Sequence, residues 1–171
     1  SEVKDTAKMV STVEEYLEDY NATNTKKMPL VMFVDAVGHV ARISRIVRQP
    51  LGNALLLGVG GSGRQSLTRL AASMGELECF QIEITKSYGK NEWRDDLKKV
   101  LLKTGEEGKQ VVFLFSDTQI VKESFLEDIN NILNTGEVPN LLDDNDVGQI
   151  LNSMRPICQG AGLPLTKVAL Y

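Results

Sequence analysis

Apolar residues in the first part of the chain recur at the spacing of amphipathic helices. One stripe runs from Met9 to Tyr20, with glutamate and aspartate between its apolar positions. A second stripe follows a polar stretch and extends to about Arg48, with Pro29 in its first turn and Pro50 ending it. The pattern therefore predicts two amphipathic helices before the chain changes character.

The second predicted helix carries a row of arginines, Arg42, Arg45 and Arg48. Positive charge near a helix C-terminus is favourable because it complements the helix dipole. A solvated helix face and a contact with a neighbouring acidic module both explain the row, and the sequence leaves both open.

Beyond Pro50 the pattern becomes an alternation of strands and helices. Apolar runs predict strands at 53–57, 79–84 and 111–115. Helical stripes predict helices at about 63–74, around Trp93 and Leu97, around Phe125 and Ile129, and near 147–154. Each connection is long enough for a crossover, which indicates an α/β sandwich of three layers with a parallel sheet. Three strands are few for such a sheet, so we expect a fragment whose later strands follow Tyr171.

A glycine-rich loop, GVGGSGRQS, joins the first predicted strand to the next helix. Its outer glycines bracket four residues, as in a phosphate-binding loop, and its inner glycines let backbone N–H groups approach an anion. The following helix adds the positive end of its dipole. The loop therefore predicts binding of a nucleoside triphosphate, with a plain strand-to-helix turn as the alternative. Its residues are Gly58, Val59, Gly60, Gly61, Ser62, Gly63, Arg64, Gln65 and Ser66.

Two positions of this loop depart from the usual motif. Arg64 replaces the lysine; it keeps the positive charge but presents a planar guanidinium. Gln65 replaces the serine or threonine whose hydroxyl ligates magnesium, and the Ser66 hydroxyl is rotated by about 100° from that direction. We therefore expect phosphate binding with a weakened magnesium ligand at Gln65 or Ser66.

An acidic residue, Asp117, follows the last predicted strand, where nucleotide hydrolases hold magnesium, often through water. Thr118 stands next to it, where related ATPases carry the glutamate that polarises the attacking water. Threonine is no general base at neutral pH. We therefore predict that Asp117 faces magnesium and that hydrolysis is slow or absent. We assign a catalytic role to no residue. A turn or capping role is the alternative for Asp117.

Composition excludes several other functions. A net charge of −4 argues against a nucleic-acid partner. No apolar run approaches the roughly 20 residues that cross a bilayer, and the N-terminus lacks the pattern of a secretory signal, so we expect a cytosolic protein without membrane contact. Cys79 and Cys158 form no metal-binding motif and are predicted to be reduced thiols. The acidic run 143–146 does not fit a calcium-binding loop.

Four segments in this order resemble a dynein heavy chain: LLLGVGGSGRQSLTRLAA, FQIEITKSYGKNEWRDDLKKVL, VVFLFSDTQI and DINNILNTGEVPNLL. The axonemal type fits best, and within it the fourth AAA+ module of the motor ring. PLVMFVDAVGHVARISRIVRQPLGNALL matches the start of that module. The resemblance therefore divides the chain into a module at 29–171 and a preceding helix and linker at 1–28. It implies a P-loop NTPase fold of the AAA+ type, truncated before the sensor motifs.

The resemblance also implies a function for the module. It would bind ATP or ADP with Mg²⁺ and act as a regulatory or structural part of a microtubule motor, with Gly58–Ser66 holding phosphates, Asp117 facing magnesium and Thr118 in the catalytic glutamate position. The partners would be neighbouring AAA+ modules, and, through the whole motor, microtubules and the dynein light and intermediate chains. The location would be the cytoplasm and the cytoskeleton of a cilium or flagellum axoneme. An active ATPase module and a spacer that binds no nucleotide are the alternatives.

Overall fold

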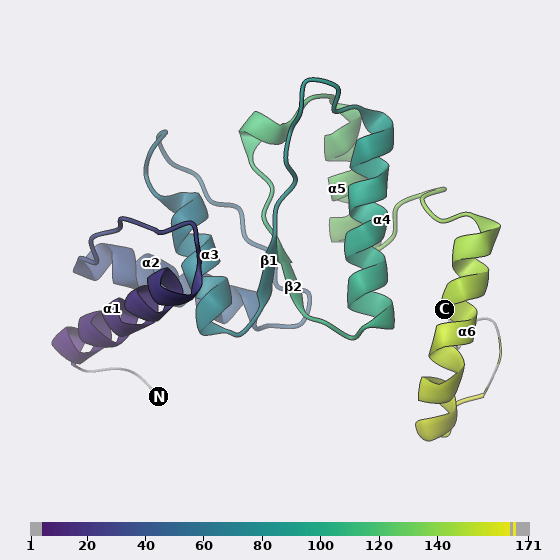
Figure 1. Cartoon of the computed structure of the whole chain (residues 1–171), viewed down its shortest axis with the longest axis horizontal. Helices are drawn as coiled ribbons and strands as arrows, with labels where there is room; N and C mark the ends of the chain where they lie inside the picture. The colour runs from purple at the N-terminus through teal and green to yellow at the C-terminus, as the bar shows by residue number, and fades with distance from the viewer. Residues whose placement is uncertain (1–4, 165, 167–171) are drawn as a thin grey trace. The chain divides into compact units, whose positions relative to one another are not determined.

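The structure is a computed structural model that describes residues 5–164 and 166. Its contacts divide the chain into two compact units. The first unit extends to Phe80 and includes Val112–Leu114, and the second contains Gln81–Val111 and the chain from Phe115 onward. Figure 1 labels the helices and strands of both units. Each unit is described by itself below.

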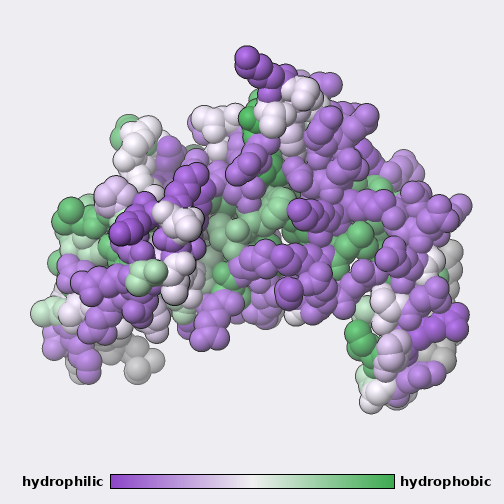
Figure 2. Space-filling model, in the orientation of Figure 1, coloured by the Kyte–Doolittle hydropathy of each residue, from purple (hydrophilic) through white to green (hydrophobic). Residues whose placement is uncertain are grey.

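Three helices build the core of the first unit: α1 (Thr6–Thr23), α2 (Val34–Val47) and α3 (Arg64–Met74) (Figure 1). The apolar stripes predicted for these segments are the faces that pack together, because burial of one apolar stripe stabilises each helix. Figure 2 shows hydrophobic surface among hydrophilic residues in this part of the chain. The buried residues of this core include Val13, Leu17, Met28, Met32, Val37, Val40, Ile43, Leu67, Leu70 and Ala71.

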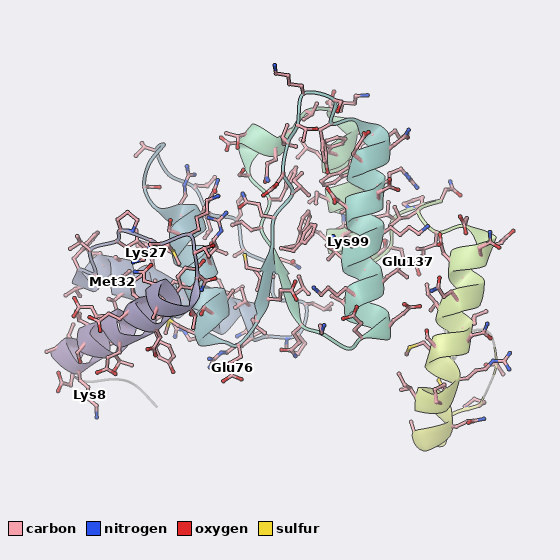
Figure 3. All side chains as sticks on the ribbon, viewed as in Figure 1. Lys8, Lys27, Met32, Glu76, Lys99 and Glu137 are labelled. Atoms are coloured by element: carbon pink, nitrogen blue, oxygen red, sulfur yellow. The ribbon has the colours of Figure 1, made fainter. Side chains whose placement is uncertain are left out.

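The connection between α1 and α2 is held by one asparagine side chain. The backbone N–H of Met28 donates to Oδ1 of Asn21 (2.6 Å), and Nδ2 of Asn21 donates to the carbonyl of Met28 (3.2 Å). Figure 3 labels Lys27 and Met32 on this connection, and the Met28 and Met32 side chains are both buried.

Two sequence predictions about this region are wrong. The first helix does not stop before Asn21 but continues to Thr23, and the second begins at Val34 rather than at Pro29. The clamp on Met28 explains the late start. A helix that began at Pro29 would need the carbonyl of Met28 to accept its first helical bond, but this carbonyl already accepts from Asn21 and from the N–H of Leu30 (3.0 Å).

The sheet consists of two short parallel strands, β1 (Glu78–Phe80) and β2 (Val111–Phe113). The N–H of Leu114 continues the pairing by donating to the carbonyl of Phe80 (2.8 Å). Helix α4 (Lys90–Glu106) lies between the two strands in the sequence, which is the predicted crossover connection. Both strands are shorter than the predicted runs at 79–84 and 111–115.

The strand predicted at 53–57 is wrong for this structure, because the residues described there have no strand assignment. A strand needs a neighbouring strand to bond its backbone, and periodicity cannot supply that partner. Leu56 packs against the core of the first unit. Leu55 and Leu57, the side chains on either side of it, are 85% and 83% exposed.

The core of the second unit is aromatic. Trp93 of α4 stacks on Phe125, with ring centroids 4.5 Å apart and planes 9° apart, and Tyr88 meets the edge of Phe125. Phe125 lies on α5 (Ser124–Thr135), and the predicted burial of Trp93, Leu97 and Phe125 is confirmed. The indole N–H of Trp93 donates to Oδ2 of Asp128 (2.9 Å), so that the buried ring leaves no polar atom without a partner.

The last helix, α6 (Asp144–Gly160), is longer than the predicted 147–154 and continues through Pro156. The acidic run at its start forms a cap: the N–H of Asp146 donates to Asp143, and the N–H of Asp143 donates to Asp146. Asp146 also pairs with Lys98 of α4, and this bond lowers the pKa of Asp146 and raises the pKa of Lys98. The surface over α4 is mostly hydrophilic (Figure 2).

Both cysteines are free thiols, as predicted. Cys158 is buried and Cys79 is half-buried. Burial raises the pKa of the Cys79 thiol, and the charge of Arg69 opposes that shift only in part. Over the described residues, every helix is too short or too polar to cross a membrane.

We expect the replacement Asn21→Ala to destabilise the first unit by about 1–3 kcal/mol, because the N–H of Met28 loses its partner and the carbonyl of Met28 keeps only the N–H of Leu30. Urea unfolding followed by circular dichroism measures the change. The matched control is Asn24→Ala, whose exposed side chain bonds one helix carbonyl, that of Tyr20, and should cost about 0.5 kcal/mol. Equal effects of the two variants would contradict the role of the clamp.

Candidate functional site

The glycine loop is shaped by two residues with positive φ. Gly61 has φ +78° and Gly63 has φ +75°, a region of backbone geometry that side chains with a Cβ rarely adopt. Gly63 is the N-cap of α3, and its carbonyl accepts the first helical bond, from Leu67 (2.8 Å). The N–H of Ser62 donates to the carbonyl of Val59 (3.3 Å), which closes the turn. The loop therefore leads directly into the first turn of the helix, as predicted.

The N-terminus of α3 opens onto this loop. Among the described residues no side chain caps it, and the first N–H groups of a helix have no partner within the helix. A Cβ placed at Gly60 or Gly61 would meet no other atom within 4 Å, so the space over these glycines is open. Backbone donors and the positive end of the helix dipole therefore meet at an accessible surface, which suits an anion.

Three polar side chains begin α3. Arg64 is half-buried, and its guanidinium donates to the carbonyls of Leu56 (3.2 Å) and Val59 (3.3 Å). Gln65 is exposed, and Ser66 is half-buried. No cluster of three or more acidic, histidine or cysteine ligands gathers in the part of the chain that the structure describes. A magnesium role for Gln65 or Ser66 stays a prediction.

A cationic hollow of about 300 Å³ lies beside the loop, on the first unit. Ser66 belongs to both the loop and the hollow. The sequence pattern does not indicate this hollow, because Lys26 and Lys27 lie in a polar stretch typical of a linker and approach α3 only through the fold. The lining residues are Tyr20, Lys26, Lys27, Met28, Pro29, Ser66 and Arg69.

Asp117 belongs to the second unit, where it begins a short 3₁₀ helix, η1 (Asp117–Gln119). Its carboxylate is exposed and accepts the N–H of Thr118 (3.0 Å), and the Thr118 hydroxyl bonds the hydroxyl of Ser116 (3.0 Å). This geometry matches the turn role left open above. The magnesium role of Asp117 and the position of Thr118 as a substitute for a catalytic glutamate stay predictions.

Gln119 holds this turn in place and was not singled out from the sequence. Its side chain is 5% exposed; Nε2 donates to the carbonyl of Ile82 (2.5 Å), and Oε1 accepts the N–H of Ser116 (2.8 Å). One amide thus joins the segment after β1 to the turn after β2. The only sign of this role in the sequence is an uncharged amide just after an apolar strand. The sequence does not indicate its partner, the carbonyl of Ile82, which is 37 residues away.

Several known proteins are similar to this chain in sequence. A family model described as the P-loop containing dynein motor region D4 matches residues 28–171. The chain is 62% identical over 163 residues to dynein axonemal heavy chain 1 of Rattus norvegicus and 62% identical over 164 residues to that of Homo sapiens. It is 52% identical over 170 residues to the dynein-1-beta heavy chain, flagellar inner arm I1 complex, of Chlamydomonas reinhardtii. These matches cover 95%, 96% and 99% of the chain, which spans about 4% of the length of each relative.

We expect Gln119→Glu to destabilise the second unit by about 2 kcal/mol at neutral pH, because a carboxylate cannot donate to the Ile82 carbonyl. Burial would raise the pKa of the new carboxyl above its unfolded value, so the charged form is the one penalised. The loss should therefore shrink at acidic pH, where the protonated group can donate again. Urea unfolding at pH 4.5 and 7.5 measures both effects.

The matched control is Gln149→Glu, at an exposed position of α6. It should change the unfolding free energy by no more than about 0.5 kcal/mol at either pH. A loss at Gln119→Glu that is small, or that does not depend on pH, would show that the amide does not hold the turn.

Proposed function

The chain belongs to the axonemal dynein heavy chains and lies in the region of their motor that forms the fourth AAA+ module, and from this membership we propose that it binds ATP or ADP at residues 58–66. The observation that carries the proposal is the turn of the loop. Gly61 and Gly63, both with positive φ, lead straight into the uncapped first turn of α3. Backbone donors at a helix N-terminus are a recurrent device for holding phosphates.

The loop would hold the phosphates, because the space over Gly60 and Gly61 is open. The cationic hollow beside the loop would hold another part of the nucleotide. Ser66 is shared by loop and hollow, and Lys26 and Lys27 bring positive charge to the hollow wall. A volume of about 300 Å³ is at the lower end of the range for ligand pockets, which suits one part of a nucleotide rather than all of it.

Magnesium would accompany the nucleotide, and Asp117 is the carboxylate that would hold it, through water. The residues at the start of α3 fit a magnesium ion less well than they fit phosphates. Gln65 offers an amide where a hydroxyl is usual, and the Ser66 hydroxyl lies one helical step away. Thr118, next to Asp117, cannot take a proton from water at neutral pH. The module therefore holds ATP with little or no hydrolysis and acts as a regulatory or structural part of the ring.

The whole protein works as a microtubule motor of a cilium or flagellum. The names of its relatives, which are axonemal and flagellar heavy chains, support this part of the proposal. Residues 29–171 form the nucleotide-binding module, and residues 1–28 form a preceding helix and linker. The direct partners are the neighbouring AAA+ modules of the same heavy chain. Microtubules and the light and intermediate chains are partners through the complete motor.

We expect Gly61→Val to reduce the affinity for MgATP by at least about tenfold, because a β-branched residue is strained at φ +78° and the loop must change shape. Isothermal titration calorimetry measures the affinity. The strain at this φ should also cost about 1–3 kcal/mol of unfolding free energy, so a thermal unfolding curve must show that the variant is folded at the temperature of the titration.

The control is Gly38→Ala, within α2, where a Cβ also meets open space. It should leave affinity unchanged and stabilise the helix by about 0.5–1 kcal/mol. Absence of heat and of any melting-temperature shift with millimolar MgATP in the unmodified chain would reject nucleotide binding and favour a spacer module.

We also expect bound ATP to be recovered intact, because Thr118 provides no general base. Phosphate release from radiolabelled ATP, measured over a single turnover with excess protein, tests this. A release rate on the order of 1 s⁻¹ or faster, as in ordinary enzymes, would establish an active ATPase module instead. Radiolabelled ATP without protein and radiolabelled ATP with Gly61→Val provide the background rates.

A further inference from the structure

The side chain of Arg64 crosses its own phosphate loop. One terminal nitrogen, Nη1, donates to the carbonyl of Leu56 (3.2 Å), and the other, Nη2, donates to the carbonyl of Val59 (3.3 Å). These carbonyls lie on either side of Gly58 in the sequence. Leu56 packs against the core of the first unit, whereas Val59 is 80% exposed. The guanidinium therefore ties the outer part of the loop to a residue that the core holds.

Gly58 leaves the space for this crossing. A Cβ at Gly58 would lie 3.5 Å from Cδ and 3.6 Å from Nε of Arg64, and 3.2 Å from Oγ of Ser62. Gly58 is not among the glycines with positive φ, so its backbone does not by itself call for glycine. A Cβ at Gly58 would therefore touch the arginine stem at ordinary van der Waals distance and would meet the Ser62 hydroxyl more tightly.

We propose that Arg64 is a positioning residue that braces the phosphate loop in its binding shape before any nucleotide arrives. A guanidinium is a rigid planar fork, so two of its nitrogens can bond two separate carbonyls at once. A lysine has one ammonium at that place, which keeps the charge but has no fork. The effect on affinity rests on the function proposed above, while the brace itself exists without nucleotide.

The brace has an unusual consequence: restoring the usual lysine of the motif weakens the loop. In nucleotide-free Arg64→Lys, the Ser62 amide, which donates to Val59, should exchange with solvent about tenfold faster, as measured by NMR. The affinity for MgATP should fall about tenfold in calorimetry. Arg45→Lys, an exposed site on α2, is the matched control and should change neither quantity.

Chemical rescue separates the fork from the charge. Arg64→Ala should show the same fast exchange at Ser62, and millimolar methylguanidinium should slow it, whereas methylammonium at equal concentration should not. Arg64→Lys, which keeps the charge and most of the side-chain stem, tests the brace if Arg64→Ala does not fold.

Two results would overturn the proposal. One is a Ser62 amide that exchanges at the same rate in Arg64→Lys as in the unmodified chain. The other is MgATP affinity equal to or higher than that of the unmodified chain in the lysine variant, which would make Arg64 an ordinary phosphate ligand. If the unmodified chain binds no nucleotide, the proposed function fails, and the exchange rates still decide whether Arg64 braces the loop.

Discussion

Backbone N–H and C=O groups outside helices and strands need hydrogen-bond partners, and in this chain planar polar side chains supply many of them. Asn21 bonds both backbone groups of Met28, Gln119 joins Ser116 to Ile82, and Arg64 bonds the carbonyls of its own loop. Each side chain bonds two groups at once. The three irregular segments that matter most, the connection before α2, the glycine loop and the turn at Asp117, keep their shapes through these pairs.

The helices were predictable because their signal is local. Apolar stripes identify α1, α3, α4 and α5, although not the end of α1, since a helix bonds its own backbone and needs only one buried face. The run at 53–57 has an equally apolar sequence, but a strand depends on a partner that periodicity does not contain. The start of α2 depends in the same way on Asn21, seven residues before Met28.

The residues of the candidate site also differ in whether local sequence or the fold determines their role. Glycine spacing indicated the loop, because a positive φ at Gly61 and Gly63 is a local demand that the residue type reveals. Lys26, Lys27 and Gln119 escaped notice because the fold, rather than the spacing, gives them their neighbours. The direction of the Arg64 side chain was equally hidden: the motif suggests a group aimed at phosphate, and the structure shows it bonded to carbonyls of the loop.

The stacked pair of Trp93 and Phe125 has a practical consequence for optical work. Trp93 is the only tryptophan of the chain, it is fully buried, and it belongs to the second unit. Intrinsic tryptophan emission therefore reports on the aromatic core around α4 and α5. The glycine loop contains no aromatic residue, so a change in tryptophan emission on adding a ligand reports on this aromatic core and not on the loop itself. A spectroscopic label placed in the first unit is needed to follow the loop directly.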